Sequence, residues 1–378
     1  MRAHARQKLF QRPDKWVVMQ SIEIYVGSET TRVLIGPGAR SALPDILDTR
    51  VRCDRFAIVA DATVASLHLP SILAALARRT PAAVLQVPPG EASKTLASAE
   101  RLYGGLADAK IGRDGLVLAL GGGMIGDLAG FVAATWLRGI PFVFCPTTTE
   151  AAIDAAIGGK TAINHPAGKN LIGAFHAAAA VVIDSDFLRT LPARDFSAGL
   201  AESVKHALIA DGAFLDWHEQ EAARLLAREA DAVTALILRN CGIKADVVAR
   251  DARERDWRAV LNFGHTVGHA LEHVLGFELR HGECVALGII AENEIARARG
   301  WLDAAVCERV RSLLAALGLP TRLPRPVSPG EAWAAARVDK KVRGGAVRCV
   351  LLRGLAKPEL SVPIERTEMD AAVACLAD

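Results

Sequence analysis

In the first half of the chain, short apolar runs alternate with segments of helical spacing. The strands predicted from this pattern cover residues 56–60, 83–87, 116–120, 142–145 and 181–183. Helices are expected between them, over residues 96–111 and 124–136. The strand sequences hardly alternate between apolar and polar residues, as expected of strands buried on both faces. The pattern therefore predicts an α/β domain with a parallel sheet.

The pattern changes near Leu191 and Pro192. From Phe196 to about Leu317, apolar residues recur mostly at helical spacing and strand patterns nearly vanish. One late strand is predicted over residues 347–352. We therefore expect a disordered tail over residues 1–20, an α/β domain over residues 21–195 and an all-α domain over residues 196–378.

Composition excludes several classes of protein. The chain has 378 residues, of which 51% are hydrophobic and 23% charged, as in a globular protein of two domains or one large one. Lys+Arg (45) nearly balance Asp+Glu (42), so neither a nucleic acid nor a membrane surface is an expected partner. No apolar run approaches the roughly 18 residues of a membrane span. Seven dispersed cysteines and no signal peptide pattern predict reduced thiols and a cytoplasmic location.

A glycine motif follows one of the predicted strands. Gly121, Gly123 and Gly126 satisfy G-x-G-x-x-G and open a predicted helix. Glycines at such a turn let backbone N–H groups approach a pyrophosphate. The acidic residue usual about 20 positions later is missing, so a tight turn in a packed βα unit is the alternative interpretation. Asp127 could face a ribose or nicotinamide, and Asp61, at the end of another strand, a ribose hydroxyl.

Histidines and carboxylates crowd a short stretch of the second half. They are His265, His269, Glu272, His273, His281 and Glu283. On a helix, His265 and His269 share one face because they are four residues apart. Two histidines, one carboxylate and an open position would form a catalytic zinc site, although a lone histidine is more often a satisfied polar residue. Spacing alone leaves open which three residues would bind.

Other charged residues have competing interpretations. Glu202 and Lys205 lie one helical turn apart, either as a solvated ion pair or, given their apolar neighbours, as a buried functional pair. Lys160 and Lys169 stand in glycine-rich turns, where lysines suit a phosphate or carboxylate ligand. Two surface lysines are an equally good interpretation.

Together these segments resemble the 3-dehydroquinate synthase family of sugar-phosphate cyclases. The resemblance runs from about residue 55 to residue 352. Its motifs occur in family order: GGGMIGDLAGF (121–131), PTTT (146–149), GGKTAINHPAGKNLIGAF (158–175), FLRTLP (187–192), AGLAESVKHALI (198–209), LNFGHTVGHALE (261–272), HGE (281–283) and DKKV (339–342). Departures at Pro89, Glu150 and Trp257 leave an amino-dehydroquinate synthase as an alternative.

The resemblance implies a Rossmann-like NAD domain, a helical domain, an active site in the cleft between them, and a homodimer. It implies that Glu202, His265 and His281 bind Zn²⁺ or Co²⁺. The implied NAD contacts are Asp61, Glu91, Lys94, Gly123, Met124, Ile125, Gly126, Asp127, Thr147, Thr148, Lys160, Lys169, Phe187, Leu188, Arg189 and Thr190. The implied substrate residues are Asp154, Lys160, Lys169, Asn170, Lys205, Lys244, Arg258, Asn262, His269 and Lys340 or Lys341. Arg138 resembles an arginine that reaches the phosphate site of the neighbouring subunit.

The implied reaction converts 3-deoxy-D-arabino-heptulosonate 7-phosphate to 3-dehydroquinate and phosphate, in the shikimate pathway to aromatic amino acids. It combines NAD-assisted oxidation, phosphate elimination, reduction and aldol cyclisation. A metal- and NAD-dependent polyol dehydrogenase shares the two-domain plan and is the alternative from another class. The cluster of Lys160, Lys169 and Arg258 favours the cyclase, because a simple dehydrogenase has little use for a phosphate site.

Overall fold

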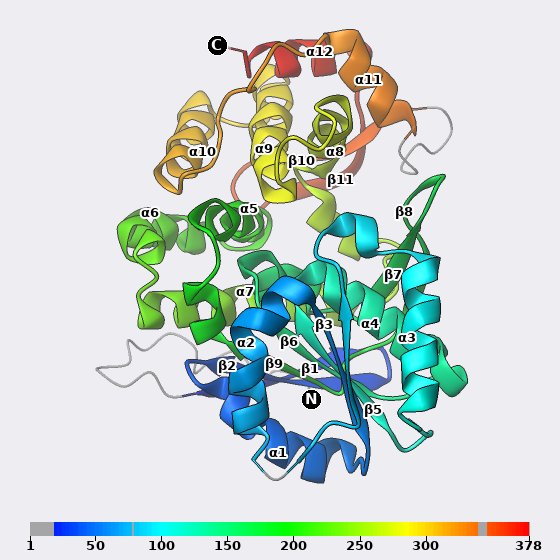
Figure 1. The fold of residues 1–378 in the computed structure, drawn as a ribbon. Coiled ribbons are helices and arrows are strands. Elements are labelled where there is room, and N and C mark those ends of the chain that lie inside the picture. Colours follow the sequence, from blue (N-terminus) through cyan, green and yellow to red (C-terminus); the bar gives the residue numbers. More distant parts are fainter. Residues whose placement is uncertain (1–18, 78, 339–345, 378) are drawn as a thin grey trace.

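The computed structural model describes residues 19–77, 79–338 and 346–377 (Figure 1). Within this part, a seven-stranded sheet has the order β1-β2-β9-β6-β5-β3-β4. Its strands are β1 (Gln20–Val26), β2 (Glu29–Gly36), β3 (Phe56–Asp61), β4 (Ala83–Val87), β5 (Leu116–Gly121), β6 (Phe142–Pro146) and β9 (Ala180–Asp184). Only β1 runs antiparallel to its neighbour among these paired strands.

All five strands predicted from apolar runs are present, as β3, β4, β5, β6 and β9. Every residue of β3, β5, β6 and β9 is buried, which explains their lack of alternation. The sequence pattern set no bounds for β1 and β2, because β1 is an edge strand with exposed polar positions. Gln20 pairs with Ile35, so the sheet starts inside the segment expected to be a tail. Residues 1–18 of that segment lie outside the described residues.

Helices of the first half cover the sheet and connect its strands (Figure 1). They are α1 (Leu43–Asp45), α2 (Ala62–Ala75), α3 (Leu96–Asp108) and α4 (Gly123–Thr135), with short helical turns at η5 (Ala151–Ala155) and η6 (Ser185–Arg189). Both predicted helices are present, as α3 and α4. Because β3 lies between β4 and β5, the strand order reverses there, and ligands of such sheets bind at this point. Asp61 ends β3 and the Gly121–Gly123 turn ends β5 at the same edge.

A hairpin outside the main sheet carries the two lysines. It consists of β7 (Lys160–His165) and β8 (Gly168–Phe175), and it packs beside α3 and α4 (Figure 1). The placement of Lys160 and Lys169 in turns was therefore wrong, since Lys160 begins β7 and Lys169 lies in β8. The sequence pattern did not predict these two strands, because both polar and apolar residues of β8 are exposed.

The second half is mainly helical. Its helices are α5 (Ala193–Ala210), α6 (Gly212–Leu226), α7 (Ala230–Arg250), α8 (His265–Val274), α9 (His281–Ala298), α10 (Ala304–Ala316), α11 (Pro329–Val338) and α12 (Arg366–Ala374), with a helical turn η7 (Trp257–Asn262). The predicted late strand is present as β10 (Arg348–Leu352), paired with β11 (Pro358–Pro363). The sequence did not predict β11, because this strand begins and ends with proline, which is rare in the interior of a sheet. None of the helices in the described part of the chain has the length and apolar character needed to cross a membrane.

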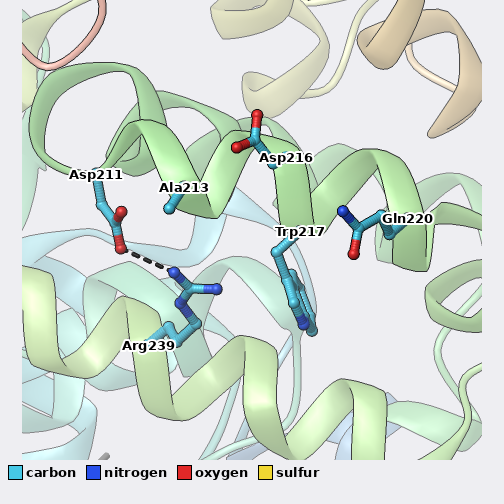
Figure 2. Close-up of a pocket in the computed structure, with 6 residues that line it drawn as sticks. All are labelled: Asp211, Ala213, Asp216, Trp217, Gln220 and Arg239. Atoms are coloured by element: carbon cyan, nitrogen blue, oxygen red, sulfur yellow. Dashed lines mark hydrogen bonds and ion pairs between the residues drawn. The ribbon is translucent and has the colours of Figure 1, made fainter. Parts of the chain in front are cut away.

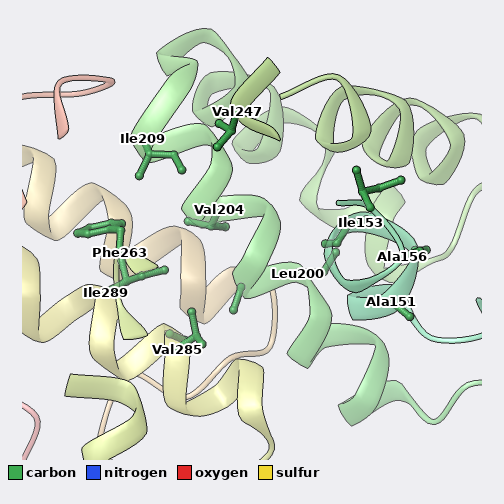
Figure 3. Packing of buried hydrophobic residues seen from close by; sticks show 14 of the residues in the cluster. Ala151, Ile153, Ala156, Leu200, Val204, Ile209, Val247, Phe263, Val285 and Ile289 are labelled. Carbon is green, nitrogen blue, oxygen red and sulfur yellow. The ribbon is translucent and has the colours of Figure 1, made fainter. Parts of the chain in front are cut away.

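One apolar cluster joins the two halves through α5 (Figure 3). Leu200 and Val204 of α5 lie between Ile153 of η5 and Val285 and Ile289 of α9. Helix α5 is therefore fixed against the sheet side and the helical side at once. The boundary expected at residues 195 and 196 falls in the first turn of α5, and it stays a prediction.

Replacement of Gly288 on α9 by alanine is expected to destabilise the fold. A Cβ there would lie 1.9 Å from the carbonyl oxygen of Gly264, a backbone atom that cannot rotate away. We expect Gly288→Ala to lower the free energy of unfolding by about 1–3 kcal/mol, as overpacking does. Gly242→Ala on α7 is the matched control, because a Cβ there meets nothing within 4 Å. It should leave stability unchanged or raise it by up to about 1 kcal/mol. Equal urea midpoints for the two variants would contradict the expected clash at Gly288.

Candidate active site

A cleft of about 910 Å³ contains side chains from both halves of the chain. The hairpin β7–β8, η5, α5, α7, η7, α8 and α9 each contribute to its wall. The predicted site residues that line it are Asp127, Asp154, Lys160, Asn170, Lys205, Lys244, Arg258, Asn262, His265, His269 and His281. Residues spread over more than 150 positions of sequence thus meet in one place.

The three predicted metal ligands lie together at this cleft, where His265 and His281 line the wall and Glu202 is buried beside them. Glu202 comes from the middle of α5, whereas His265 and His281 are the first residues of α8 and α9. Glu202 Oε1 lies 3.5 Å from His265 Nε2 and 3.5 Å from His281 Nε2. His265 Nδ1 lies 3.0 Å from the carbonyl oxygen of Phe263, which can only accept a hydrogen bond. Nδ1 therefore carries the proton, and Nε2 faces Glu202 with a lone pair.

Two other groups of donor atoms are also compact. Nitrogen atoms of His265, His269 and His281 lie within 4.8 Å of one another, as do donor atoms of Asp154, Glu202 and His206. The second group suits a cation poorly, because ammonium groups of Lys205 and Lys244 already contact its carboxylates. Geometry therefore favours a metal site on the histidine side of the cleft, with Glu202 as the carboxylate that reaches it.

Burial and neighbouring charges set the protonation of these groups. Burial lowers the pKa of His265 to about 3, so its ring is neutral at neutral pH. Burial would also lower the pKa of His281, but its contacts with Glu202 and Glu272 raise that pKa well above the ordinary value. Burial would raise the pKa of Glu202, whereas Lys205 and His265 hold it well below its usual range. The cleft thus presents an ionised carboxylate beside one neutral and one protonated imidazole.

The Glu202–Lys205 pair is buried, with 1% of each side chain exposed. The solvated-pair interpretation was therefore wrong, and the buried pair is confirmed. A second, partly buried pair joins Lys244 Nζ to Asp154 Oδ1 at 2.7 Å. Burial would raise the pKa of Asp154, but Lys244 and Lys205 hold it well below its ordinary value. Both carboxylates therefore stay charged, each against an ammonium group.

Cationic and amide side chains at the cleft rim are held by acidic residues. Lys160 pairs with Glu254, and Asn262 Nδ2 lies 3.3 Å from the same carboxylate. Lys169 Nζ lies 2.9 Å from Glu272 Oε1. The sequence offered no way to single out Glu254, which stands in a run of charged residues.

Arg258 is buried against the backbone, with 1% exposed. Its Nη1 donates to the carbonyl oxygens of Gly158 at 3.0 Å and Ala252 at 2.8 Å. Its Nε has no hydrogen-bond partner among the described residues. Backbone carbonyls therefore fix its guanidinium at the cleft, and it is not a solvated charge.

The glycine turn contains two glycines that are packed closely and the uncapped N-terminus of a helix. A Cβ at Gly126 would lie 2.5 Å from Phe144 Cε1, and one at Gly121 would strike Ile125, so these two glycines serve close packing. Helix α4 begins at Gly123 with no side-chain cap and no acidic residue in its first turn. Its first N–H groups are therefore directed towards the sheet edge without a side-chain acceptor.

Lys94 connects the loop after β4 to the glycine helix and the hairpin. Its side chain is buried, and its Nζ donates to Asp127 Oδ2 and Asn170 Oδ1. Burial raises the pKa of Asp127 more than Lys94 lowers it. Glu91 Oε1 accepts from Asn164 Nδ2 at 2.8 Å. Three residues predicted to contact a nucleotide, Glu91, Lys94 and Asp127, thus form one interaction set.

The remaining predicted residues lie at the sheet edge or away from this cleft. Asp61 Oδ1 caps α2 by accepting from Val64 N at 2.9 Å, and Thr190 Oγ1 lies 2.8 Å from His68 Nε2. Thr147, Phe187 and Leu188 are buried, whereas Arg189 is exposed. Arg138 is exposed in the turn after α4, with φ of 72°, and does not line the cleft of its own chain. Lys340 and Lys341 lie outside the described residues.

A shallower hollow of about 550 Å³ lies on α6 and α7 (Figure 2). Asp211, Ala213, Asp216, Trp217, Gln220 and Arg239 line it. Arg239 Nη2 donates to Asp211 Oδ2 at 2.9 Å across it. None of the predicted site residues lies there, so the cleft is the candidate active site.

Comparisons with known proteins identify the family of this chain. Residues 84–198 match the family model "3-dehydroquinate synthase N-terminal", and residues 199–342 match "3-dehydroquinate synthase C-terminal". The 3-dehydroquinate synthase of Symbiobacterium thermophilum is 45% identical over 329 residues, covering 86% of this chain and 92% of the relative. The chloroplastic enzyme of Solanum lycopersicum is 40% identical over 337 residues, covering 88% of this chain and 76% of the relative.

Solved structures share the fold. A 2-epi-5-epi-valiolone synthase from Streptomyces hygroscopicus, with NAD⁺ and Zn²⁺ bound, has a TM-score of 0.84 and 29% identity, covering 93% of this chain and 98% of its own. A 2-deoxy-scyllo-inosose synthase complexed with carbaglucose-6-phosphate, NAD⁺ and Co²⁺ has a TM-score of 0.87 at 24% identity, covering 94% and 99%. The second match bears on the fold alone. With two family models covering most of its length, the chain belongs to the 3-dehydroquinate synthase family.

Proposed function

We propose that this chain is a 3-dehydroquinate synthase that converts 3-deoxy-D-arabino-heptulosonate 7-phosphate to 3-dehydroquinate and phosphate. One observation carries the proposal. The histidines of a carboxylate–histidine cluster line a single cleft together with lysine, arginine and asparagine side chains. A sugar with both a carboxylate and a phosphate needs such cationic groups, and relatives of that name are 40–45% identical over most of this chain.

The donor set fits a divalent metal ion. Glu202, His265 and His281 offer one carboxylate and two imidazoles, the ligands of many catalytic zinc sites. The Phe263 carbonyl directs the lone pair of His265 Nε2 towards Glu202, as outer-sphere partners of metal sites do. We assign these three residues as the ligands of Zn²⁺ or Co²⁺ and His269 as a substrate contact. When bound, the ion supplies Lewis acidity at a substrate oxygen, and NAD supplies a reversible hydride acceptor.

The edge of the sheet fits a dinucleotide. The uncapped N-terminus of α4 and the reversal of strand order between β3 and β5 lie at one edge, where such ligands bind in related sheets. The proposed contacts come from Asp61, the Gly123–Asp127 segment, Thr147, Thr148 and residues 187–190. Lys94 and Glu91 hold Asp127 and the hairpin in place around this edge.

Cationic residues of the chain bind and orient the substrate in this proposal. Lys160, Lys169 and Arg258 neutralise its phosphate and carboxylate, and the orphan Nε–H of the buried Arg258 is one donor for them. Glu254 and Glu272 hold the lysines extended before substrate arrives. Asp154, Lys205, Lys244 and Asn262 have fixed charges or amides that orient sugar hydroxyls, and fixed orientation lowers the barrier of successive steps.

Incubation of the pure chain with the heptulosonate phosphate, NAD⁺ and Zn²⁺ tests the proposed reaction. We expect one phosphate released per 3-dehydroquinate formed, with no net NADH absorbance, because the hydride returns to the substrate. A polyol incubated under the same conditions is the control. Net NADH from the polyol without phosphate release would establish a dehydrogenase. Turnover confined to the amino analogue of the substrate would establish an amino-dehydroquinate synthase.

Binding of Zn²⁺ to the metal-free protein is expected to release a proton and to strengthen as pH rises. The raised pKa of His281 keeps its ring protonated at pH 7, whereas a metal ligand must be neutral. Affinity should therefore rise by about tenfold per pH unit until pH exceeds that pKa. Titration calorimetry in buffers of different ionisation enthalpy measures the proton directly. A heat that does not depend on the buffer would contradict the assignment of His281 as a ligand.

We also propose that the chain acts as a cytoplasmic homodimer in which Arg138 completes the cleft of the partner. Support comes from the exposed position of Arg138 and its absence from the cleft of its own chain. Arg138→Ala and Glu202→Ala should each be nearly inactive alone. Mixed by refolding in equal amounts, they should recover roughly a quarter of wild-type activity, because half the dimers are mixed and each then has one intact site. No recovery in mixed dimers would place Arg138 in the cleft of its own chain.

A further inference from the structure

A network of buried hydrogen bonds lies beneath the cleft and joins α5, α6 and α7. Ser203 Oγ lies 2.7 Å from His218 Nε2, and Asn240 Nδ2 donates to the same oxygen at 2.7 Å. His206 Nδ1 lies 2.8 Å from Asn240 Oδ1. All four side chains have 0% exposure. The proposed function uses none of these residues, which we call the His206 network.

Two backbone carbonyls fix the ring of His218 and the amide of Asn240. His218 Nδ1 lies 2.6 Å from the carbonyl oxygen of Phe214, so Nδ1 carries the proton and Nε2 accepts from the Ser203 hydroxyl. Burial lowers the pKa of His218 to about 4, which agrees with a neutral ring. Asn240 Nδ2 also donates to the carbonyl oxygen of Leu236 at 2.8 Å. Asn240 Oδ1 is therefore an acceptor, and His206 Nδ1 must donate to it.

This arrangement directs the other nitrogen of His206 towards the cleft. His206 Nε2 is buried, has no hydrogen-bond partner among the described residues, and lies 3.6 Å from Asp154 Oδ1. Lys244 Nζ contacts the same carboxylate oxygen at 2.7 Å. Hydrogen bonds that serve catalysis are often long in a free enzyme and tighten when substrate binds. Asp154 is ionised and can only accept, so this bond needs His206 as an imidazolium with protons on both ring nitrogens. A small movement of the Asp154 carboxylate would then close it.

Helix geometry places the network directly behind the proposed substrate residues. On α5, Ser203 and His206 belong to the network. One position earlier in each case, Glu202 contacts the imidazoles of the cleft and Lys205 lines it. On α7, Asn240 and Lys244 lie one turn apart, the first in the network and the second against Asp154. Trp217 and Arg239, which precede His218 and Asn240 in the sequence, line the outer hollow instead (Figure 2). The network therefore sets the rotation of α5 and α7 about their axes.

We propose that His206 is a positioning residue for Asp154, held by Asn240 through Nδ1 so that its Nε2 orients the Asp154 carboxylate towards the substrate. The inference rests on the proposed function, because Asp154 acts on the substrate of that reaction. It differs from a purely structural tie between helices, which would affect stability and leave the reaction rate of the folded enzyme unchanged.

Two substitutions of His206 separate these roles. The side-chain amide of His206→Asn lies near the position of Nδ1, so it can keep the bond to Asn240 but leaves nothing facing Asp154. The amide of His206→Gln lies near the position of Nε2 and can donate to Asp154. We expect His206→Asn to lower kcat by about 10- to 100-fold, as loss of an outer-sphere partner does, with little change in KM. His206→Gln should recover part of that loss.

Controls separate positioning from stability. Thr234→Val, also on α7, removes a partly buried bond from Thr234 Oγ1 to the carbonyl oxygen of Ala230 at 2.6 Å without reaching the cleft. Asn240→Leu should lower kcat, whereas Thr234→Val should lower only the thermal midpoint. The proposal is overturned if kcat of His206→Asn equals that of Thr234→Val, or if His206→Gln is no more active than His206→Asn.

Ring ¹⁵N chemical shifts of the intact protein test the network without an activity measurement. We expect His218 to carry its proton on Nδ1 alone, and His206 to carry protons on both Nδ1 and Nε2, with the Nδ1 hydrogen bond lost in Asn240→Leu. A proton on His218 Nε2 would overturn the network. Wild-type turnover with unchanged kcat in His206→Asn would overturn this inference alone, whereas absence of phosphate release by the wild-type chain would overturn the proposed function as well.

Discussion

The buried ion pair between Glu202 and Lys205 is the interaction on which the rest of the cleft depends. Two charges with 1% exposure must be compensated by close partners, because removal from water costs several kcal/mol per ion. Glu202 faces the imidazoles of His265 and His281, and the charge of Lys205 is further balanced by Asp154. Loss of either member would leave a buried charge uncompensated, so the pair ties the site to the integrity of the fold.

Helix α5 can hold this pair because it is packed on both sides. Its apolar residues contact η5 of the first half and α9 of the second within one continuous core (Figure 3). Its polar residues divide between the cleft and the bonds to α6 and α7. A single helix thus transmits the position of the sheet to the histidine cluster, and its two polar faces are fixed by the same packing.

The sequence predicted features that depend on local pattern. The fully buried strands β3, β5 and β6 are short apolar runs, and the glycine motif marks the end of β5. The pattern set no bounds for strands β1 and β8, because their exposed residues are both polar and apolar. The spacing of the histidines could not show whether His269 or a carboxylate distant in sequence is the third metal ligand. Glu202 reaches the histidines only through the packing of α5 against α9. The sequence could not predict the contacts of Glu254, Asn164 and the His206 network, because their partners lie far away in sequence.

Glycines at the helix contacts determine how the imidazoles are spaced. A Cβ at Gly282 would lie 1.9 Å from the carbonyl oxygen of Ala198 on α5, and one at Gly268 would lie 2.8 Å from that of Cys284 on α9. The helices that present Glu202, His265 and His281 therefore meet backbone to backbone. At these two glycine contacts a backbone carbonyl sets the separation of the helices, so the spacing of the imidazoles there does not depend on the volume of a side chain.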